Sequence, residues 1–387
     1  MLRGGEVVEM LRFHRFLLSD TRDRLTLLQR AIARTVKPGD IVLDLGTGTG
    51  ILAFIACLAG ARKVYAIERE PVVELARLVS RENGFDDRIV FLDRSSEEID
   101  LPEPVDLIVT DTFGTWGLQK GGIQSVIDLR RRWLKPGGGL IPRSIELFLA
   151  PVEAPAVYDD CIALWDRRAF QVDLSPIRQL AVNNTYPVRL REDAFLGDPV
   201  SIAVADLSSI EGGAFKGQTR HIVRRSGTLD GFCAWFSAEL GEGLVLNNHP
   251  TSTTTNYAQE FFPAARRVAV ETGDCVDLAI SASAIDAIDW RWQTSIRRQN
   301  AAEPKALFDQ STFWGFPASR SQFAKLASDH VPTLSRRGEA ERVLLELLAA
   351  KSPLAEIRRT LSAQCPDAFR SDQDLSSFIG EVLDRCT

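Results

Sequence analysis

The pattern of hydrophobic and polar positions divides the chain into three stretches of different character. Over residues 10–35, apolar side chains recur near helical spacing, which predicts a helical N-terminal segment. Short apolar strands and amphipathic helices then alternate, at 41–45, 51–59, 63–67, 71–83, 89–92 and 105–110. This alternation predicts an α/β fold class, a Rossmann-like parallel sheet with helices on both faces.

The second stretch follows Pro142 and shows the two-residue period of strands with one buried face. Its apolar runs lie at 145–150, 200–205, 231–238, 267–272 and 277–281. Short strands separated by turn residues predict an antiparallel β-barrel domain over residues 143–300. Residues 155–195 break this pattern with partly helical sequence that carries several aromatic side chains, and such an insertion indicates a contact surface.

The third stretch is helical. Apolar residues at positions i, i+3 and i+4 predict three short amphipathic helices at 339–350, 353–364 and 372–384. We therefore expect an N-terminal helix and a Rossmann-like domain over 1–142, the β-barrel domain over 143–300, a linker over 301–337 and a small helical module over 338–387. A winged-helix-like fold and a plain helical cap are both open for this module.

The most informative local motif is a glycine-rich loop after the first strand. The strand at 41–45 runs into Gly46, Gly48 and Gly50, and the next strand ends in Glu68. Glycine lets the backbone turn sharply and approach a ligand, and an acid at the tip of the next strand is placed to bind the two ribose hydroxyls. The motif therefore predicts a site for a nucleoside cofactor.

The surrounding charges indicate which cofactor. The glycine spacing departs from that of dinucleotide sites, and Asp44 in the approach to the loop would repel a phosphate. S-adenosyl-L-methionine (SAM) carries a sulfonium, an ammonium and a ribose but no phosphate, so we expect SAM as cofactor and S-adenosyl-L-homocysteine as product. The alternative is a strand–helix turn with no ligand. Because ligands of such sheets bind beyond the carboxyl ends of the strands, Ser96, Glu97 and Asp111 are expected to join the site.

Composition restricts the partners and the compartment. The formal net charge of −6 gives no broad attraction to nucleic acid, and the chain shows neither an 18-residue apolar run nor a signal-peptide pattern. The six cysteines are scattered without a CxxC pair, which argues against a zinc site or a disulfide framework. We therefore expect a cytoplasmic protein with no metal, no membrane and no nucleic-acid partner.

Several segments in order resemble the protein arginine methyltransferases over roughly residues 14–295. The segments that carry the resemblance are His14–Arg22, Val42–Leu52, Ala59–Glu68, Ser96–Pro102 and Leu140–Pro142. The resemblance implies a SAM-binding domain followed by a β-barrel, and a homodimer formed through the 155–195 arm. It also implies that Arg22 binds the SAM carboxylate and that Glu97 meets the adenine amino group. We assign Arg69 to the same cofactor site, and His14 could line its mouth.

The acceptor region departs from the family pattern. Two family glutamates hold the substrate guanidinium, but their positions fall on Asp111 and Lys120, and the family's Thr-His-Trp loop carries Asn256 and Tyr257. A lysine would repel a guanidinium. We expect Asp111 to contact the acceptor or act as base, Lys120 to pair with a substrate carboxylate, and Asn256 and Tyr257 to line the pocket. Trp116 could also wall the pocket, or could simply pack.

These observations predict a SAM-dependent methyltransferase that acts on a nitrogen or oxygen of a small molecule or peptide, and not by the family's arginine mechanism. One alternative is a protein or free-arginine N-methyltransferase in which Asp111 and another acid such as Glu260 replace the usual pair. Another is a catalytically silent partner that keeps SAM. The C-terminal helices weakly resemble peptide-binding modules related to the coenzyme-PQQ chaperone, which would imply peptide recruitment.

Overall fold

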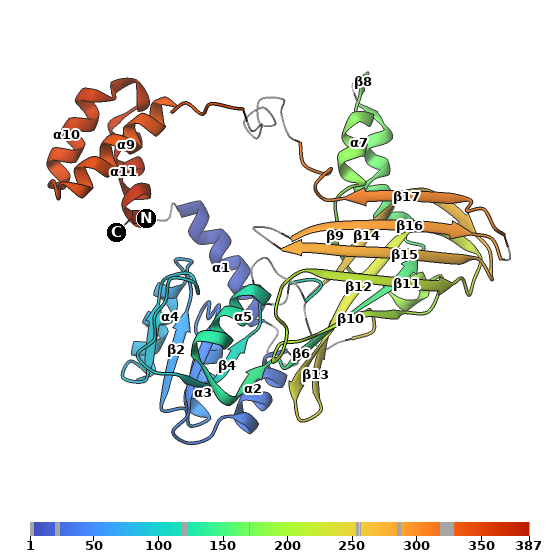
Figure 1. The fold of residues 1–387 in the computed structure, drawn as a ribbon, viewed down its shortest axis with the longest axis horizontal. Coiled ribbons are helices and arrows are strands. Elements are labelled where there is room, and N and C mark those ends of the chain that lie inside the picture. Colours follow the sequence, from blue (N-terminus) through green and yellow to red (C-terminus); the bar gives the residue numbers. More distant parts are fainter. Residues whose placement is uncertain are drawn as a thin grey trace. The chain divides into compact units, whose positions relative to one another are not determined.

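The computed structural model describes residues 4–19, 24–112, 114–117, 122–169, 171–252, 255, 257–284, 288–299, 301–317 and 329–386. The chain forms two compact units (Figure 1), of which one spans Gly4–Pro317 and the other contains the C-terminal helices. Among the described residues, no helix is both long and apolar enough to cross a membrane.

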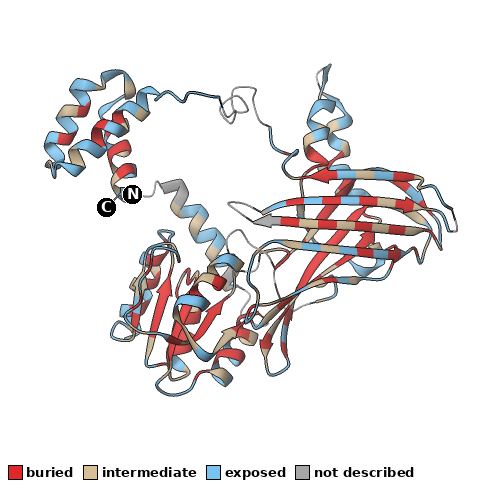
Figure 2. Ribbon diagram, viewed as in Figure 1, coloured by how far each residue is buried: buried red, intermediate tan, exposed pale blue. Residues whose placement is uncertain are grey.

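The first domain is built on a five-stranded parallel sheet, and it confirms the predicted fold class. The strand order is β3–β2–β1–β4–β5. The strands are β1 (Ile41–Leu45), β2 (Lys63–Ile67), β3 (Ile89–Leu92), β4 (Val105–Thr110) and β5 (Leu134–Ile141). The helices are α1 (Gly4–Leu18), α2 (Arg24–Thr35), α3 (Ile51–Leu58), α4 (Val73–Glu82) and α5 (Gly122–Trp133). Every residue of β1 is buried, as expected for a central parallel strand, and Figure 2 shows this buried core.

The strand β5 was not predicted, because its sequence Lys135-Pro-Gly-Gly-Gly139 is typical of a turn. It nevertheless pairs in parallel with β4, through Leu107↔Gly139 and Ile108↔Leu140. Gly139 is suited to this place, since a Cβ there would lie 3.1 Å from the Leu107 side chain. The sheet edge therefore extends directly into the second domain through Pro142.

The second domain consists of antiparallel strands in a barrel-like arrangement. One sheet has the order β10–β6–β12–β14–β9, and a further strand pairs with β12. Its strands are β6 (Ser144–Val152), β9 (Tyr186–Val188), β10 (Val200–Asp206), β12 (Gly227–Gly241), β13 (Leu244–Asn247) and β14 (Gln259–Val270). The second sheet runs β11 (Phe215–Ile222), β15 (Cys275–Ala284), β16 (Ile288–Arg297) and β17 (Ala306–Ser311). Large buried side chains such as Phe232, Phe262 and Trp292 fill the space between the strands.

Residues 155–195 leave the β-sheets and form an arm. Its elements are α6 (Pro155–Cys161), η1 (Ala163–Asp166), β7 (Arg168–Ala169), β8 (Val172–Asp173), α7 (Ser175–Ala181), β9 and η2 (Glu192–Ala194). Figure 1 shows α7 and β8 projecting from the β-domain. Arg178 anchors the base of the arm, because its guanidinium donates to the Tyr158 hydroxyl at 3.0 Å and to the Ala265 carbonyl at 2.9 Å.

One part of the expected linker is a strand. β17 lies within residues 301–337 and pairs antiparallel with β16, for example through Thr294↔Phe308. Its inward residues Ala306 and Gln310 are buried. The linker prediction is therefore wrong for 306–311, because in Ala-Leu-Phe-Asp-Gln-Ser the apolar residues are consecutive and show no alternation that would indicate a strand before it pairs with β16.

The C-terminal unit is a bundle of three helices, close to the predicted ranges. They are α9 (Arg336–Ala349), α10 (Leu354–Gln364) and α11 (Asp372–Cys386), with the short η3 (Pro366–Ala368) between the last two. They bury their own apolar core of Ala340, Val343, Leu344, Ile357, Leu361, Leu375, Phe378, Ile379 and Val382. Residues 329–386 contain no strand, so this range holds no β-wing.

Candidate cofactor and acceptor site

The glycine loop lies at the C-terminal end of β1, where parallel strands place ligands. Gly46, Gly48 and Gly50 have φ of +74°, +55° and +88°, which other residues rarely adopt. A Cβ on Gly46 would lie 2.7 Å from Cγ2 of Thr112. The loop is tied to β2, because the N–H groups of Gly46 and Thr47 both donate to the Ile67 carbonyl, at 3.0 and 2.9 Å. The predicted loop is therefore a constrained turn that has no room for a side chain at Gly46.

Glu68 sits at the tip of β2 and faces this loop. Its Oε2 accepts a hydrogen bond from the Gly48 N–H at 3.0 Å, and its Oε1 accepts one from the Glu70 N–H at 2.9 Å. These two bonds fix a half-buried carboxylate beside the glycine turn, where a ribose diol would meet it. Arg69, which was predicted to contact the cofactor, is exposed, and its guanidinium lies 3.6 Å from the Glu70 carboxylate.

Asp44 is fully buried between the neighbouring strands. Its Oδ2 accepts a hydrogen bond from Thr47 Oγ1 at 2.6 Å, whereas its Oδ1 has no partner among the described residues. Burial raises the pKa of Asp44 to about 7, the carboxylates of Asp111 and Glu68 contribute, and the Thr47 bond opposes the shift. A buried carboxylate oxygen without a partner beside two further acids is suited to a cationic ligand group, such as the ammonium of SAM.

His14 of α1 adds a side chain to the same place. Its Cε1 lies 3.1 Å from where a Cβ of Gly48 would be, so the imidazole covers the loop. Burial lowers the pKa of His14, and the charges of Glu68 and Asp111 work in the opposite direction. His14, Glu68, Asp111 and Asp44 therefore belong to one electrostatic cluster.

The segment predicted to meet the adenine is held in place by hydrogen bonds from a side chain of α5. The Arg132 guanidinium donates to the carbonyls of Ser96 at 2.6 Å and of Ile99 at 2.8 Å. Ser96 is buried and Glu97 is exposed, so the carboxylate of Glu97 is accessible at this edge. Arg132 was not among the predicted site residues, since its position in an arginine run gave no sign of these carbonyl bonds.

On the acceptor side, Asp111 meets an arginine that the sequence did not single out. Arg24, the first residue of α2, forms an ion pair with Asp111 Oδ2 and is only 2% exposed. The Tyr257 hydroxyl donates to the Asp111 carbonyl at 2.7 Å, and the Arg24 guanidinium carbon lies 5.7 Å from the Tyr257 ring centre. The structure thus brings the predicted Asp111 and Tyr257 together, around a guanidinium of the chain itself.

Glu260 of β14 lies at the same seam. Its Oε2 accepts a hydrogen bond from the Thr115 hydroxyl, and Thr185 also bonds to its carboxylate. Glu260 is largely buried and pairs with no basic side chain among the described residues, and this burial raises its pKa while the two hydroxyl bonds oppose the rise. Because Tyr257 bonds to Asp111 and Glu260 bonds to Thr115, segments 111–115 and 257–260 run alongside each other.

Asn248 fastens these two segments. This 1% exposed side chain donates to the carbonyls of Thr115 at 2.7 Å and Ala258 at 2.6 Å. Trp116 is also structural, because its ring is buried against Trp290 at 4.5 Å between ring centres and its Nε1 donates to the Phe148 carbonyl. Trp116 therefore packs rather than lining a pocket.

Three predicted site residues, Arg22, Lys120 and Asn256, lie outside the described residues. Within the described residues, no group of three or more His, Cys, Asp or Glu side chains is arranged to hold a metal ion. The described residues thus bring together a glycine turn, the acids Asp44 and Glu68 beside it, and a second pair of acids, Asp111 and Glu260.

Two family models match the chain. The model of the arginine methyltransferase oligomerization subdomain covers residues 143–293, and the model of ribosomal protein L11 methyltransferase (PrmA) covers residues 23–138. The two matches divide the larger unit near the boundary between the parallel-sheet domain and the antiparallel β-domain.

Curated relatives match most of the larger unit. Protein arginine N-methyltransferase 2 of Homo sapiens is 33% identical over 285 residues, which are 69% of this chain and 65% of the relative. Protein arginine N-methyltransferase 6 of Danio rerio is 30% identical, over 63% of this chain and 78% of the relative. Arginine N(omega)-methyltransferase of Streptomyces achromogenes subsp. streptozoticus is 29% identical, over 70% and 75% respectively. The chain thus spans slightly less than two thirds of the human relative's length.

Solved structures share the fold. A Trypanosoma brucei PRMT1 enzyme-prozyme heterotetrameric complex with AdoHcy superposes with a TM-score of 0.70 at 21% identity, covering 78% of this chain and 97% of that one. At this identity the likeness concerns the fold alone.

Proposed function

This chain belongs to the protein arginine methyltransferase family, and from that premise we propose that it is a SAM-dependent methyltransferase that acts on a guanidino nitrogen. The observation that carries the acceptor assignment is the seam between segments 111–115 and 257–260. This seam holds two acids, Asp111 directly after β4 and Glu260 of β14. They stand in for the family's glutamate pair, whose second member falls on Lys120.

The cofactor of this family is SAM, and the described residues fit it. Asp44 offers a buried oxygen without a partner for a cationic group, Glu68 is fixed for the ribose, and the glycine turn admits close backbone approach. SAM supplies a methyl group already activated by its sulfonium, so the protein's contribution is to bind the acceptor, orient it and accept its proton.

Asp111 and Tyr257 already bind a guanidinium. The Arg24 side chain contacts the Asp111 carboxylate and lies over the Tyr257 ring, and both contacts are typical of arginine recognition. A guanidino acceptor would use the same chemistry, with Asp111 sharing its carboxylate or releasing Arg24. Glu260 has no basic partner among the described residues, so an incoming guanidinium would supply the missing positive charge and lower its pKa.

The names of the relatives also favour a guanidino acceptor. Two are protein arginine N-methyltransferases and the Streptomyces protein is an arginine N(omega)-methyltransferase, so protein-bound and free arginine are both candidates. The first expectation from sequence, an acceptor without a guanidino group, retains one observation in its favour. Arg24 neutralises Asp111, which would suit an uncharged or anionic acceptor, and Lys120 could then pair with a substrate carboxylate.

The test is transfer of a radiolabelled methyl group from SAM to L-arginine, to an arginine peptide and to its lysine counterpart. We expect labelling of one or both guanidino acceptors and none of the lysine peptide. Glu260→Gln should lower kcat/KM by about tenfold or more, because a charged hydrogen bond to the acceptor is lost. Glu242→Gln is the matched control, since that carboxylate is 67% exposed and pairs only loosely with Arg34 at 3.7 Å.

Other outcomes separate the alternatives. Equal turnover of Glu260→Gln on the guanidino acceptors would remove Glu260 from the acceptor site. Labelling only of acceptors that lack a guanidino group would favour the first expectation from sequence, a methyltransferase with a different kind of acceptor. SAM binding without transfer to any acceptor would identify a catalytically silent partner.

We also propose that the chain forms a homodimer through the 155–195 arm. The family model named for oligomerization covers the arm, and β8 exposes Val172 with 58% of its surface accessible. Val172→Asp should shift the mass in sedimentation equilibrium from dimer to monomer. Val204→Asp is the control, because Val204 is 62% exposed but lies on β10, outside the arm. A cytoplasmic location stays a prediction, consistent with six free cysteines.

A further inference from the structure

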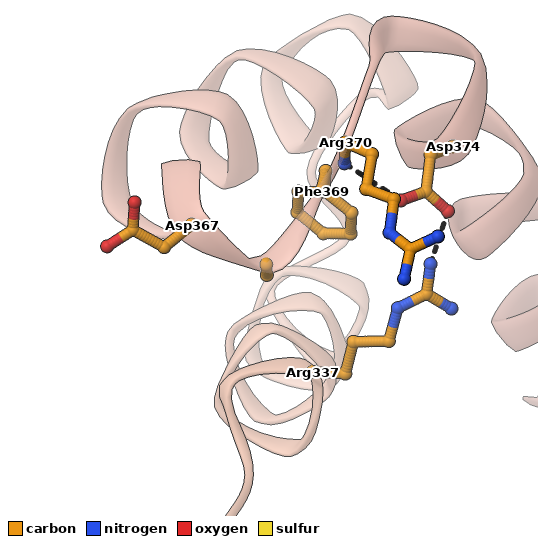
Figure 3. A pocket seen from close by; sticks show the side chains of 6 residues that line it. Arg337, Asp367, Phe369, Arg370 and Asp374 are labelled. Atoms are coloured by element: carbon orange, nitrogen blue, oxygen red, sulfur yellow. Dashed lines mark hydrogen bonds and ion pairs between the residues drawn. The ribbon is translucent and has the colours of Figure 1, made fainter.

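The C-terminal unit contains a pocket of about 450 Å³. It lies between the first turns of α9 and α11 and the η3 turn, as Figure 3 shows. The residues that line it are Arg337, Asp367, Ala368, Phe369, Arg370 and Asp374. Pockets of this size accept small ligands or one to two side chains of a larger partner.

On one side of this pocket, positive side chains outnumber negative ones. Asp374 forms an ion pair with the Arg337 guanidinium and accepts a hydrogen bond from the Arg370 backbone N–H at 2.9 Å. The Arg370 guanidinium forms no ion pair with any carboxylate of the described residues. Figure 3 shows the two guanidinium groups turned toward each other beside Asp374, while Asp367 points away from them. Two guanidinium groups thus share one carboxylate on this side of the pocket, which leaves one positive charge there, while Asp367 on the opposite side makes the lining neutral as a whole.

The floor of the pocket is apolar and rigid. The Phe369 ring packs against Phe378, with 5.2 Å between ring centres, and the Arg337 guanidinium carbon lies 5.6 Å from the Phe378 ring centre. Arg337 is therefore held by both Asp374 and an aromatic face, whereas Arg370 is exposed and available. A ligand would find one fixed and one free guanidinium next to an aromatic ring.

We propose that this pocket binds an acidic side chain of a peptide. One carboxylate matches the single positive charge left by Arg337, Arg370 and Asp374, and guanidinium groups bind carboxylates with two parallel hydrogen bonds. A phosphate carries about two negative charges, which exceeds the single positive charge on this side of the pocket. Phe369 and Ala368 offer apolar contact for the methylenes of a glutamate, and Asp367 on the other side can accept the N–H groups of a peptide backbone.

This site goes beyond methyl transfer and does not depend on which acceptor is used. Because the helical unit and the larger unit belong to one chain, a peptide bound by the helical unit is kept at a raised effective concentration for the larger one. The pocket is formed by residues of the helical unit alone, so its occupation does not require a particular placement of the two units.

The test uses the full chain and two blocked peptides that differ in one charge. Acetyl-Gly-Leu-Glu-Gly-amide and acetyl-Gly-Leu-Gln-Gly-amide are titrated into the protein and followed by calorimetry or by NMR of the backbone amides. We expect the Glu peptide to bind about tenfold more tightly than the Gln peptide, as for a charged hydrogen bond. Arg370→Ala should remove this difference, since Arg370 forms no described side-chain contact whose loss would unfold the unit.

Arg359→Ala is the matched control, because Arg359 is also exposed and forms no ion pair among the described residues, but lies on α10 away from the pocket. It should leave both affinities unchanged. Arg370→Glu should reverse the preference toward acetyl-Gly-Leu-Lys-Gly-amide. Equal binding of the Glu and Gln peptides by the unaltered chain, or inorganic phosphate that binds more tightly than the Glu peptide, would overturn the proposal. Loss of the preference in Arg359→Ala would overturn it as well.

Discussion

The guanidinium of Arg24 is ion-paired with the carboxylate of Asp111, so the first residue of α2 is fastened to the C-terminal end of β4. The Arg24 side chain is 3% exposed and that of Asp111 is 18% exposed, which places the pair out of bulk water. Removal of one partner from such a pair leaves an uncompensated charge and costs about 3–5 kcal/mol. The pair therefore couples the acceptor site to the stability of the domain.

From this pair we predict that Asp111→Ala and Arg24→Ala each lower the free energy of unfolding by about 3 kcal/mol. The double variant should lose much less than the sum, because neither charge then remains buried alone. Urea denaturation of the three variants measures this coupling. Glu9→Gln removes the partner of Arg12 in a pair whose side chains are 71% and 72% exposed, and should change stability by less than about 1 kcal/mol. Strict additivity of the two single losses would show that the pair is not coupled.

The parts of this fold that the sequence predicted are those with a strong local signal. β1, β2 and β4 are mostly apolar runs, with Asp44, Lys63 and Asp106 as their charged residues, and the glycine turn requires positive φ, so both are readable from neighbouring residues. β5 was missed because Gly137 to Gly139 indicate a turn, and Gly137 does have a φ of +78°; only the pairing of Gly139, Leu140 and Ile141 with β4 identifies the strand. β17 was missed because only its pairing with β16 identifies it as a strand.

The acceptor site was harder to predict because its residues meet only after folding. Thr115 and Glu260 are separated by 145 positions, and no local pattern connects them. Arg24 begins an amphipathic helix beside Leu25. The only signal for Arg24 in the sequence was its position on the apolar side of this helix. Asp111 and Tyr257 could be named because the family resemblance marked their segments. The resemblance gave no indication that Arg24 forms an ion pair with Asp111.

Glu68 provides the clearest test of the cofactor site. We predict that Glu68→Ala weakens SAM binding by about tenfold or more, because both the ribose contact and the bond that holds the Gly48 N–H are lost. Glu74→Gln, at a carboxylate that is 70% exposed on α4, should bind SAM as the unaltered chain does. Calorimetric titration at fixed pH compares them. Unchanged affinity of Glu68→Ala would place the ribose elsewhere.

SAM affinity should depend on pH through Asp44. The pKa of this buried carboxyl is about 7 in the free protein, so at neutral pH about half of the molecules carry the proton. A cationic ligand group favours the ionised form, and binding must therefore release a proton. We predict that affinity rises with pH up to about 7–8 and then levels, falling by at most about tenfold per pH unit below.

Calorimetry in two buffers with different ionisation enthalpies counts the released protons directly. The expected release through Asp44 is close to one below pH 6 and close to none above pH 8, because the carboxyl is then already ionised. Asp44→Asn should bind SAM weakly and without this pH dependence. A release that persists unchanged in Asp44→Asn would assign the proton to another group, such as His14.

Asp44 should also set how stability depends on pH in the absence of SAM. Since its folded pKa of about 7 lies above the unfolded value of 3.8, the folded chain binds more protons between these values, and stability falls as pH rises through this window. The accumulated loss is at most about 4 kcal/mol above pH 7. Asn cannot ionise, so the free energy of unfolding of Asp44→Asn should fall less between pH 5 and pH 8 than that of the unaltered chain. Parallel stability curves for the two proteins would contradict this assignment.

The glycine turn can be tested with a pair of substitutions that share backbone strain but differ in space. Gly46 and Gly39 have φ of +74° and +95°, so alanine is strained at both. A Cβ at Gly46 would lie 2.7 Å from Thr112, whereas a Cβ at Gly39 would meet nothing within 4 Å. Gly39→Ala should therefore cost about 1–2 kcal/mol from conformation alone and keep SAM affinity.

Gly46→Ala should cost more, because Thr112 must move, and Thr112 follows the acceptor residue Asp111. The shift would reach both the cofactor turn and the acceptor seam, so we expect SAM affinity and methyl transfer to fall together. Stability and SAM titration of the two variants provide the comparison. If Gly39→Ala and Gly46→Ala lose equal stability and both keep SAM affinity, the contact between Gly46 and Thr112 does not constrain the site. A loss confined to Gly46→Ala that is relieved by Thr112→Ser, which lacks the methyl group, would establish that the steric contact itself sets the turn.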